Sequence, residues 1–360
     1  MFSGSYAADD VIFLLKPVQI AHTDLLEKER LIQAGRHYSE MISYEAPPAP
    51  EYLSLFFDAL ARERRRFARD LLGLAEHLYR SGKRTIVSLA RAGTPVGVLV
   101  SRALRRLFHV DTAHYSISII RDRGIDENAL KYVIDQCGAE NIAFIDGWSA
   151  KGVIATELRQ SVDRFNSLYC LTVDPSLYVV ADIGGNAGWA ASTEDYLIPS
   201  SLLGATISGL VSRSILNDQV VGAEDFHGCI YYNDYSSVDL SRWFADEMFE
   251  EVQKAWQQGD LQSGGATNTA MCRRQEEMRE WIRKWLLDRG VASVHFLKPG
   301  IGEATRVMLR RIPDLLLVRD RDDPSIRHLL VLAQMRGTTV EVDRGMPFRA
   351  AAIIKKMDKL

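Results

Sequence analysis

Three short loops in the N-terminal half of the chain combine basic side chains with small residues. The first loop holds Arg91, Ala92, Gly93 and Thr94. The second holds Arg121 and Arg123, and the third holds Ser149, Ala150, Lys151, Gly152 and Val153 shortly after Asp146. Small residues let backbone N–H groups approach an anion, and Arg binds phosphate oxygens in bidentate fashion. These loops therefore predict a site for a phosphorylated ligand.

Each loop follows an apolar run that predicts a buried strand. The runs cover residues 85–90, 115–120 and 141–146, and a further strand is expected at 168–174. Segments with helical spacing lie between them, as in PVGVLVSRALRRLF and GVIATELRQSVDRF. This alternation is typical of an α/β fold with a mainly parallel sheet flanked by helices, in which ligands bind at the carboxyl ends of the strands. The three loops should therefore meet at one edge of the sheet.

Composition limits the class of protein. With 360 residues, of which 47% are hydrophobic, the chain is expected to form two domains, and its formal charge of −3 argues against a basic nucleic-acid coat. No run approaches the roughly 20 apolar residues of a membrane helix. The four cysteines are widely spaced and form no CxxC pair, which predicts neither a metal site nor disulfides. We expect a cytoplasmic protein without membrane contact; its oligomeric state stays open.

A polar segment divides the chain. Residues 257–272 are rich in Gly, Ser, Thr, Asn and Gln, which predicts a linker. We expect a larger domain over residues 1–256, with an N-terminal helical extension, and a second small α/β domain over residues 273–360. In the second domain the segment PFRAAAII (347–354) is expected to be helical.

The order of the three loops resembles that of the type I phosphoribosyltransferases. The resemblance implies that fold, with the Arg91 loop on the diphosphate and residues 149–153 around the 5-phosphate of phosphoribosyl diphosphate (PRPP). By the same resemblance Asp146 contacts the ribose, and the catalytic loop with Arg121 and Arg123 closes over the leaving group. The implied reaction is Mg2+-dependent transfer of phosphoribose from PRPP to a nitrogenous acceptor. Gly147 stands where the family has a second acid, which keeps a non-catalytic ribose-phosphate sensor open as an alternative.

The segment after Asp174 is a candidate for recognition of the acceptor base. It combines a Gly-rich stretch with Trp189 and with the acids Asp182, Glu194 and Asp195, which together are able to stack on and hydrogen-bond a heterocycle. A long structured loop between sheet elements explains the same composition equally well.

Longer segments resemble the StiP lineage of phosphoribosyltransferase-like proteins from tellurite-resistance and stress operons. These segments include FSGSYAADDVIFLLKP, RHYSEMISYE and EDYLIPSSLLGATISGLVSRSI. Members of this lineage are sometimes called cysteine proteases, which gives a second alternative. A thiol protease needs a cysteine beside a histidine, and Cys229 lies two residues after His227 in an expected strand, so that both side chains point the same way.

The C-terminal segment resembles the pelota-type RNA-binding domain. Gly302, Glu303, Thr305 and Arg306 stand at the start of the helix that contacts RNA in that fold, and Asp323-Pro324 ends the following acidic loop. The resemblance implies RNA as a partner, with Glu303 accepting from a base and Arg306 contacting phosphate. Docking of a protein at this helix is the alternative.

Overall fold

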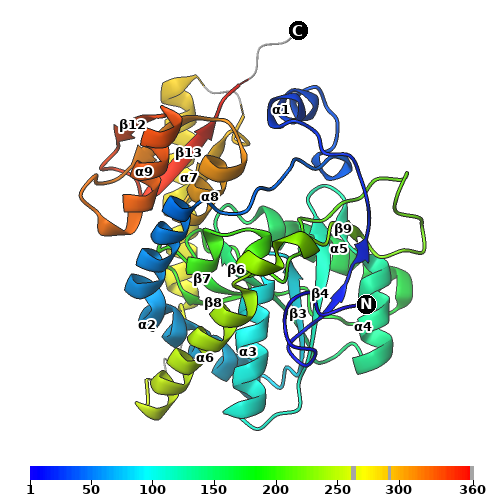
Figure 1. Cartoon of the computed structure of the whole chain (residues 1–360). Helices are drawn as coiled ribbons and strands as arrows, with labels where there is room; N and C mark the ends of the chain where they lie inside the picture. Colours follow the sequence, from blue (N-terminus) through cyan, green and yellow to red (C-terminus); the bar gives the residue numbers. More distant parts are fainter. Residues whose placement is uncertain (261–264, 291–292, 357–360) are drawn as a thin grey trace.

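The computed structural model describes residues 1–260, 265–290 and 293–356, and it has two parts (Figure 1). The larger is a mostly parallel sheet flanked by helices, and the smaller is a C-terminal α/β domain. This confirms the predicted fold class, whereas the finer assignment to the type I phosphoribosyltransferases stays a prediction. None of the helices in the described residues is both long and apolar enough to cross a bilayer.

The central sheet has the strand order β1-β4-β3-β6-β7-β8, and all neighbours along this path are parallel. Its strands are β1 (Ile12–Leu14), β3 (Thr85–Ala90), β4 (Ala113–Ile120), β6 (Ile142–Ser149), β7 (Leu177–Asp182) and β8 (Trp189–Ser192). The short β5 (Gly124–Ile125) pairs antiparallel with the end of β4. Because β3, β4 and β6 are adjacent, the loops that follow them share one edge of the sheet.

Helices cover both faces of this sheet. On one face α2 (Pro50–Arg80), α3 (Thr94–Arg106) and α6 (Ser241–Gln257) pack together, and on the other lie α4 (Glu127–Cys137) and α5 (Val153–Tyr169). Helix α2 starts with Pro50 at its first turn, where proline's missing N–H costs nothing, and its buried stripe includes Phe56, Phe67 and Leu74. The alternation of strand and helix predicted this arrangement.

The N-terminal segment and the connections add smaller elements. Strand β2 (Lys16–Pro17) pairs parallel with β9 (Gly228–Cys229), and α1 (Leu25–Gln33) follows β2. The 3-10 turns are η1 (Tyr38–Glu40), η2 (Pro199–Ser201), η3 (Ala205–Ile207), η4 (Asn233–Val238) and η5 (Pro324–Ile326).

The C-terminal domain is built on a second sheet with the order β10-β13-β11-β12. Its elements are α7 (Asn268–Arg289), β10 (Leu297–Pro299), α8 (Ile301–Arg310), β11 (Pro313–Val318), α9 (Arg327–Arg336), β12 (Thr339–Val342) and β13 (Ala350–Ile354). Helices α8 and α9 cover one face of the sheet, and Met278 and Trp285 of α7 pack on the other. The apolar cluster under α8 and α9 is continuous with the one between α2 and the central sheet, so the two domains share a core.

Three expectations about secondary structure are wrong. Residues 168–174 form no strand, because α5 continues to Tyr169 and ends where Cys170 adopts a left-handed conformation. The segment expected to be helical at 347–354 contains β13, whose small alanines let it lie between β10 and β11 with every residue buried. The linker is shorter than 257–272, because the Thr267 side chain accepts from the Ala270 N–H and starts α7 at Asn268; residues 261–264 of that prediction lie outside the described residues.

Candidate anion-binding cavity and cysteine sites

A cavity of about 850 Å³ lies between the two domains. It is bounded by the loops after β3 and β6, by the chain around residues 42–52, and by β10 and α8 of the C-terminal domain. Its lining includes most of the residues predicted from the sequence: Arg91, Ala92, Arg121, Asp146, Ser149, Ala150, Lys151, Gly152, Val153, Glu303 and Arg306. Segments far apart in the sequence thus converge, as the adjacency of the parallel strands requires.

Two residues of the Arg91 loop, Gly93 and Thr94, do not line the cavity but hold the loop in position. A Cβ at Gly93 would lie 2.5 Å from the carbonyl oxygen of Ile145, so only glycine allows the loop to pack this closely on β6. Thr94 is fully buried at the start of α3, where its hydroxyl and that of Ser116 are 2.7 Å apart. Both residues position the loop and do not contact the cavity space.

Arg91 itself is held in place by an acid. Its guanidinium binds both carboxylate oxygens of Glu45, at 2.8 and 2.7 Å, and donates to the carbonyl of Val211 at 2.7 Å. Burial raises the pKa of Glu45, but Arg91, Arg310 and the Ala205 N–H together outweigh burial and hold that pKa below its ordinary value. Arg91 is therefore a fixed cation in the cavity wall, and its guanidinium already binds a carboxylate.

The Arg121–Arg123 loop is pinned to η1. The backbone N–H of Arg121 donates to the Tyr38 hydroxyl at 2.9 Å, and Arg123 binds Glu40 at 2.6 Å. Arg121 pairs with the neighbouring Asp122 at 2.8 Å. The predicted pair is therefore divided: Arg121 lines the cavity, whereas Arg123 is engaged with η1.

Asp146 is the titratable acid on the sheet side of the cavity. It follows the apolar residues of β6, and its carboxylate accepts from the backbone N–H of Gly147 at 2.7 Å. Burial raises its pKa to about 6, while Arg306 opposes the rise and Glu303 adds to it. A carboxyl with this pKa takes up and releases protons near neutral pH.

Lys151 does not present its ammonium freely to a phosphate. Its Nζ donates to the carbonyl oxygens of Val294 at 2.8 Å and Leu297 at 2.7 Å, in the C-terminal domain. Burial lowers its pKa to about 7, and Lys298 nearby contributes to the same shift. In this structure Lys151 joins the β6 loop to β10.

The start of α8 faces the N-terminal domain. Gly302 lies on the indole of Trp148, where a Cβ would be 2.7 Å from Cε2, and Arg306 stacks over the same ring at 5.7 Å. Arg306 also binds Glu303 at 3.0 Å. Thr305 is buried and donates to the Ile301 carbonyl at 2.7 Å. Glu303 and Arg306 therefore line the cavity, while Gly302 and Thr305 are covered.

Among the described residues, ten lysines and arginines line the cavity against three acids, Glu45, Asp146 and Glu303. The basic residues are Lys28, Arg91, Arg121, Lys151, Arg213, Lys298, Arg306, Arg310, Arg311 and Arg336. Sequence reasoning missed Lys28, Arg213, Lys298 and Arg336. They come from separate segments without a shared motif, so no local signal marks them.

The cavity wall does not fit a protein-held Mg2+. In the part of the chain that the structure describes, no three His, Cys, Asp or Glu side chains lie close enough together to hold a metal ion. Hard divalent cations need several oxygen ligands, and this wall is mainly cationic. The predicted role of Mg2+ was tied to the diphosphate donor and stays a prediction.

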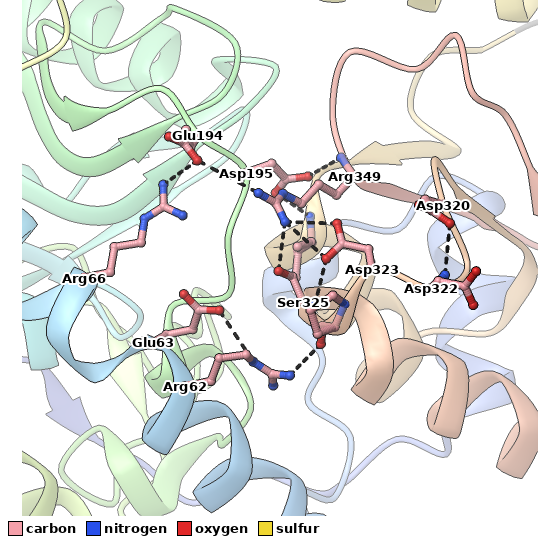
Figure 2. Close-up of polar contacts among 12 residues, drawn as sticks. Arg62, Glu63, Arg66, Glu194, Asp195, Asp320, Asp322, Asp323, Ser325 and Arg349 are labelled. Atoms are coloured by element: carbon pink, nitrogen blue, oxygen red, sulfur yellow. Dashed lines mark hydrogen bonds and ion pairs between the residues drawn. The ribbon is translucent and has the colours of Figure 1, made fainter.

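The segment after Asp174 has structural roles in this fold. Trp189 stacks on His77 with ring centroids 4.4 Å apart, and Asp182 accepts from the backbone N–H groups of Asn186 and Ala187 at 2.6 Å. Figure 2 shows Glu194 beside Arg66, at 2.8 Å, and Asp195 at the domain contact. These intramolecular contacts agree with the interpretation of the segment as a structured loop between sheet elements, rather than as a site for an acceptor base.

Asp195 connects the two domains. Its carboxylate accepts from the backbone N–H of Ile301 at 2.9 Å and from that of Arg349 at 2.8 Å. The Arg349 side chain binds Asp323 at 3.0 Å and Ser325 at 2.9 Å in its own domain, and it also pairs with Glu194 of the other domain at 3.9 Å (Figure 2). An acid of one domain thus stabilises the positive N-terminus of α8 in the other.

The cysteine environments differ sharply. Cys229 is fully buried among apolar side chains that include Phe13 and Val211, and burial raises the pKa of its thiol to about 12. Cys137 is half-buried with its sulfur 3.9 Å from the Tyr115 hydroxyl, and Cys170 and Cys272 are exposed. Within the described residues, no hydrogen bond joins a cysteine to a histidine.

His227 belongs to a small polar cluster close to Cys229 in sequence. Its Nδ1 lies 2.8 Å from the Ser118 hydroxyl, and its backbone N–H donates to the Asp126 carboxylate at 2.6 Å. Burial lowers the pKa of His227, and Asp126 opposes that effect. The imidazole is therefore neutral at pH 7 and able to accept a proton.

Comparison with known proteins decides the family. Residues 4–249 match the family described as tellurite-like stress resistance cysteine protease StiP. The chain belongs to the StiP family. A StiP relative from Acinetobacter baylyi (strain ATCC 33305 / BD413 / ADP1), named cysteine protease StiP, is 40% identical over 371 residues, covering 99% of this chain and 95% of the relative. Residues 276–356 match the PELOTA RNA binding domain.

These matches confirm the StiP and pelota resemblances and overturn the predicted reaction. The StiP family is described as cysteine proteases, so the prediction of phosphoribose transfer from PRPP is wrong. In the structure, Arg91 is occupied by Glu45, Lys151 by carbonyl groups and Arg123 by Glu40. Small loops between parallel strands and helices recur in many α/β proteins, so their order did not specify the chemistry.

Proposed function

We propose that the protein is a StiP-type cysteine protease. The observation that carries this proposal is the identity of 40%, over 99% of the chain, with a protein named cysteine protease StiP. The family match over residues 4–249 supports the same activity, which we therefore propose for the N-terminal part of the chain.

Cys229 and His227 are the candidate nucleophile and base. His227 is neutral, its ring is held by Ser118 and its backbone by Asp126, and it is two residues from Cys229. In such a reaction the base takes the thiol proton, sulfur adds to the peptide carbonyl, and the proton passes to the departing amine; water then hydrolyses the thioester. A thiol with a pKa of about 12 is protonated at pH 7, so attack requires the β2–β9 pair to open and expose Cys229.

Cleavage of fluorescently labelled casein by the purified full-length chain tests the proposal. We expect Cys229→Ala and His227→Gln to abolish cleavage, while Cys170→Ala, which changes an exposed cysteine, leaves the rate unchanged. Circular dichroism spectra that match wild type exclude misfolding as the cause of a loss. Full activity of Cys229→Ala contradicts this assignment, and an inactive wild-type chain contradicts the protease proposal as a whole.

We also propose that the C-terminal domain binds RNA, on the basis of the pelota family match over residues 276–356. Glu303 and Arg306 are the residues that we expect to contact the RNA, and both line the cavity. Filter binding with short single-stranded RNAs tests it. Arg306→Ala should weaken binding, and the exposed Arg283→Ala in α7 should not.

A further inference from the structure

Three cations in the cavity wall form no ion pair and no side-chain hydrogen bond among the described residues. They are Lys28 of α1, Lys298 of β10 and Arg310 of α8. Most of the neighbouring cations are engaged: Arg311 binds Glu29 of α1 at 2.8 Å, and Arg213 donates to the carbonyl of Tyr38 at 2.9 Å. The three free cations thus come from both domains and face one space.

The cationic groups are close enough to disfavour one another's charge. Burial, together with the nearby Arg213 and Arg311, lowers the pKa of Lys28 to about 7. Burial likewise lowers the pKa of Arg310 to about 10, with Arg91 acting in the same direction. Half-buried like charges that outnumber the nearby carboxylates are costly, and an anion that bridges them relieves this repulsion.

The size and chemistry of the cavity indicate a small ligand with several negative charges. A volume of about 850 Å³ lies in the range of small-molecule sites. Arg310 offers a planar fork for phosphate oxygens, and the two lysines offer point charges. Trp148 and Tyr52 also line the cavity and give an apolar surface for a ring.

We propose that this cavity binds a polyphosphorylated nucleotide, whose phosphates are held by Lys28, Lys298 and Arg310. The site differs from the loops singled out in the sequence, because its three cations lie on α1 and on the C-terminal domain. Ligand binding here links the two domains and α1, and it is independent of the thiol chemistry at Cys229.

Isothermal titration of the full-length chain with ATP and with inorganic tripolyphosphate tests the site. We expect both probes to bind, ATP more tightly, and we expect Arg310→Ala and Lys298→Ala each to weaken binding by about tenfold or more. Arg310→Lys keeps the charge and should retain part of the affinity. The matched control is Arg283→Ala, an exposed arginine of α7, which should bind as wild type does.

Three outcomes would overturn the proposal. The first is the absence of binding by both probes up to about 1 mM, a concentration at which even weak specific sites are detected. The second is equal weakening by Arg310→Ala and Arg283→Ala, which indicates nonspecific charge attraction. The third is binding of single-stranded RNA alone. Thermal denaturation of each variant without ligand identifies any loss of binding that comes from misfolding. If Arg310→Ala is misfolded, the affinity of Arg310→Lys takes its place as the test, and an affinity equal to that of wild type would then contradict the proposed role of Arg310.

Discussion

Lys151 in the loop after β6 donates a hydrogen bond to the carbonyl of Leu297 in β10, at 2.7 Å, and so ties the N-terminal domain to the C-terminal one. A second bond from the same Nζ reaches Val294 at 2.8 Å. Lys151, which the sequence predicted to bind a phosphate, thus connects the two domains.

Replacement of Lys151 by Met should weaken this contact between the domains and lower the free energy of unfolding. Two carbonyl groups lose their donor, which costs about 1–3 kcal/mol where the groups stay out of water. Urea denaturation measures the change, and Lys284→Met on the exposed surface of α7 is the control. Equal stability of Lys151→Met and wild type would show that water replaces the ammonium.

Asp146→Asn should change how stability depends on pH. The pKa of Asp146 rises from 3.8 when unfolded to about 6 when folded, so the folded state binds the extra proton between these values. Wild type therefore loses stability relative to Asp146→Asn as pH rises from about 4 to 6, by at most about 3 kcal/mol. Melting temperatures of both proteins across this range provide the measurement; a constant difference contradicts the raised pKa.

Arg91→Ala should destabilise the fold. It removes the partner of Glu45, whose carboxylate also accepts from the Ala205 N–H at 2.8 Å, and leaves a half-buried charge uncompensated. The expected loss is about 3 kcal/mol, with Arg91→Lys losing less because one charge remains. Because the pKa of Glu45 is lowered in the folded state, its contribution is present above its ordinary pKa and is lost as pH falls; Arg91→Ala should flatten this acid limb.

Gly302→Ala should disturb the contact between α8 and Trp148. The added Cβ would lie 2.7 Å from Cε2 of the indole, and relief of such a clash costs about 1–3 kcal/mol. The double variant with Trp148→Leu should recover much of this loss, because the smaller side chain makes room. A double-mutant cycle from denaturant unfolding gives the coupling energy; additive losses would mean that the contact is unimportant.

Thiol labelling should separate the cysteines. Exposed Cys170 and Cys272 should react with iodoacetamide at pH 8, whereas buried Cys229, with a pKa of about 12, should react at least about a hundredfold more slowly. Mass spectrometry of peptides after timed labelling measures each rate. Rapid labelling of Cys229 in the native protein would reveal opening of the β2–β9 pair.

The sequence predicted the sheet and the meeting of its loops because both depend on local patterns. Apolar strands at residues 85–90 and 141–146 have helices after them, and adjacent parallel strands must bring Arg91 and Asp146 to one edge. The roles of these residues depended on partners distant in sequence, such as Glu45 for Arg91, which no pattern around either residue encodes.

Other features required the tertiary structure itself. The alanines of β13 favour a helix locally, and only their burial between β10 and β11 makes a strand the better choice. Lys28, Lys298 and Arg310 stand in three unrelated segments, so their convergence appears only when the C-terminal domain packs on α1 and the sheet. The protease assignment came from overall similarity, since the fold buries Cys229.

The capping of α8 by Asp195 has a consequence for how the molecule assembles. No side chain of the C-terminal domain caps this helix among the described residues, and the acid that does so lies in the domain translated first. The N-terminus of α8 therefore gains its capping acid only when the C-terminal domain packs on the N-terminal one, and the shared core buries apolar surface in the same contact. Both domains should then melt as one cooperative unit, with a single calorimetric transition.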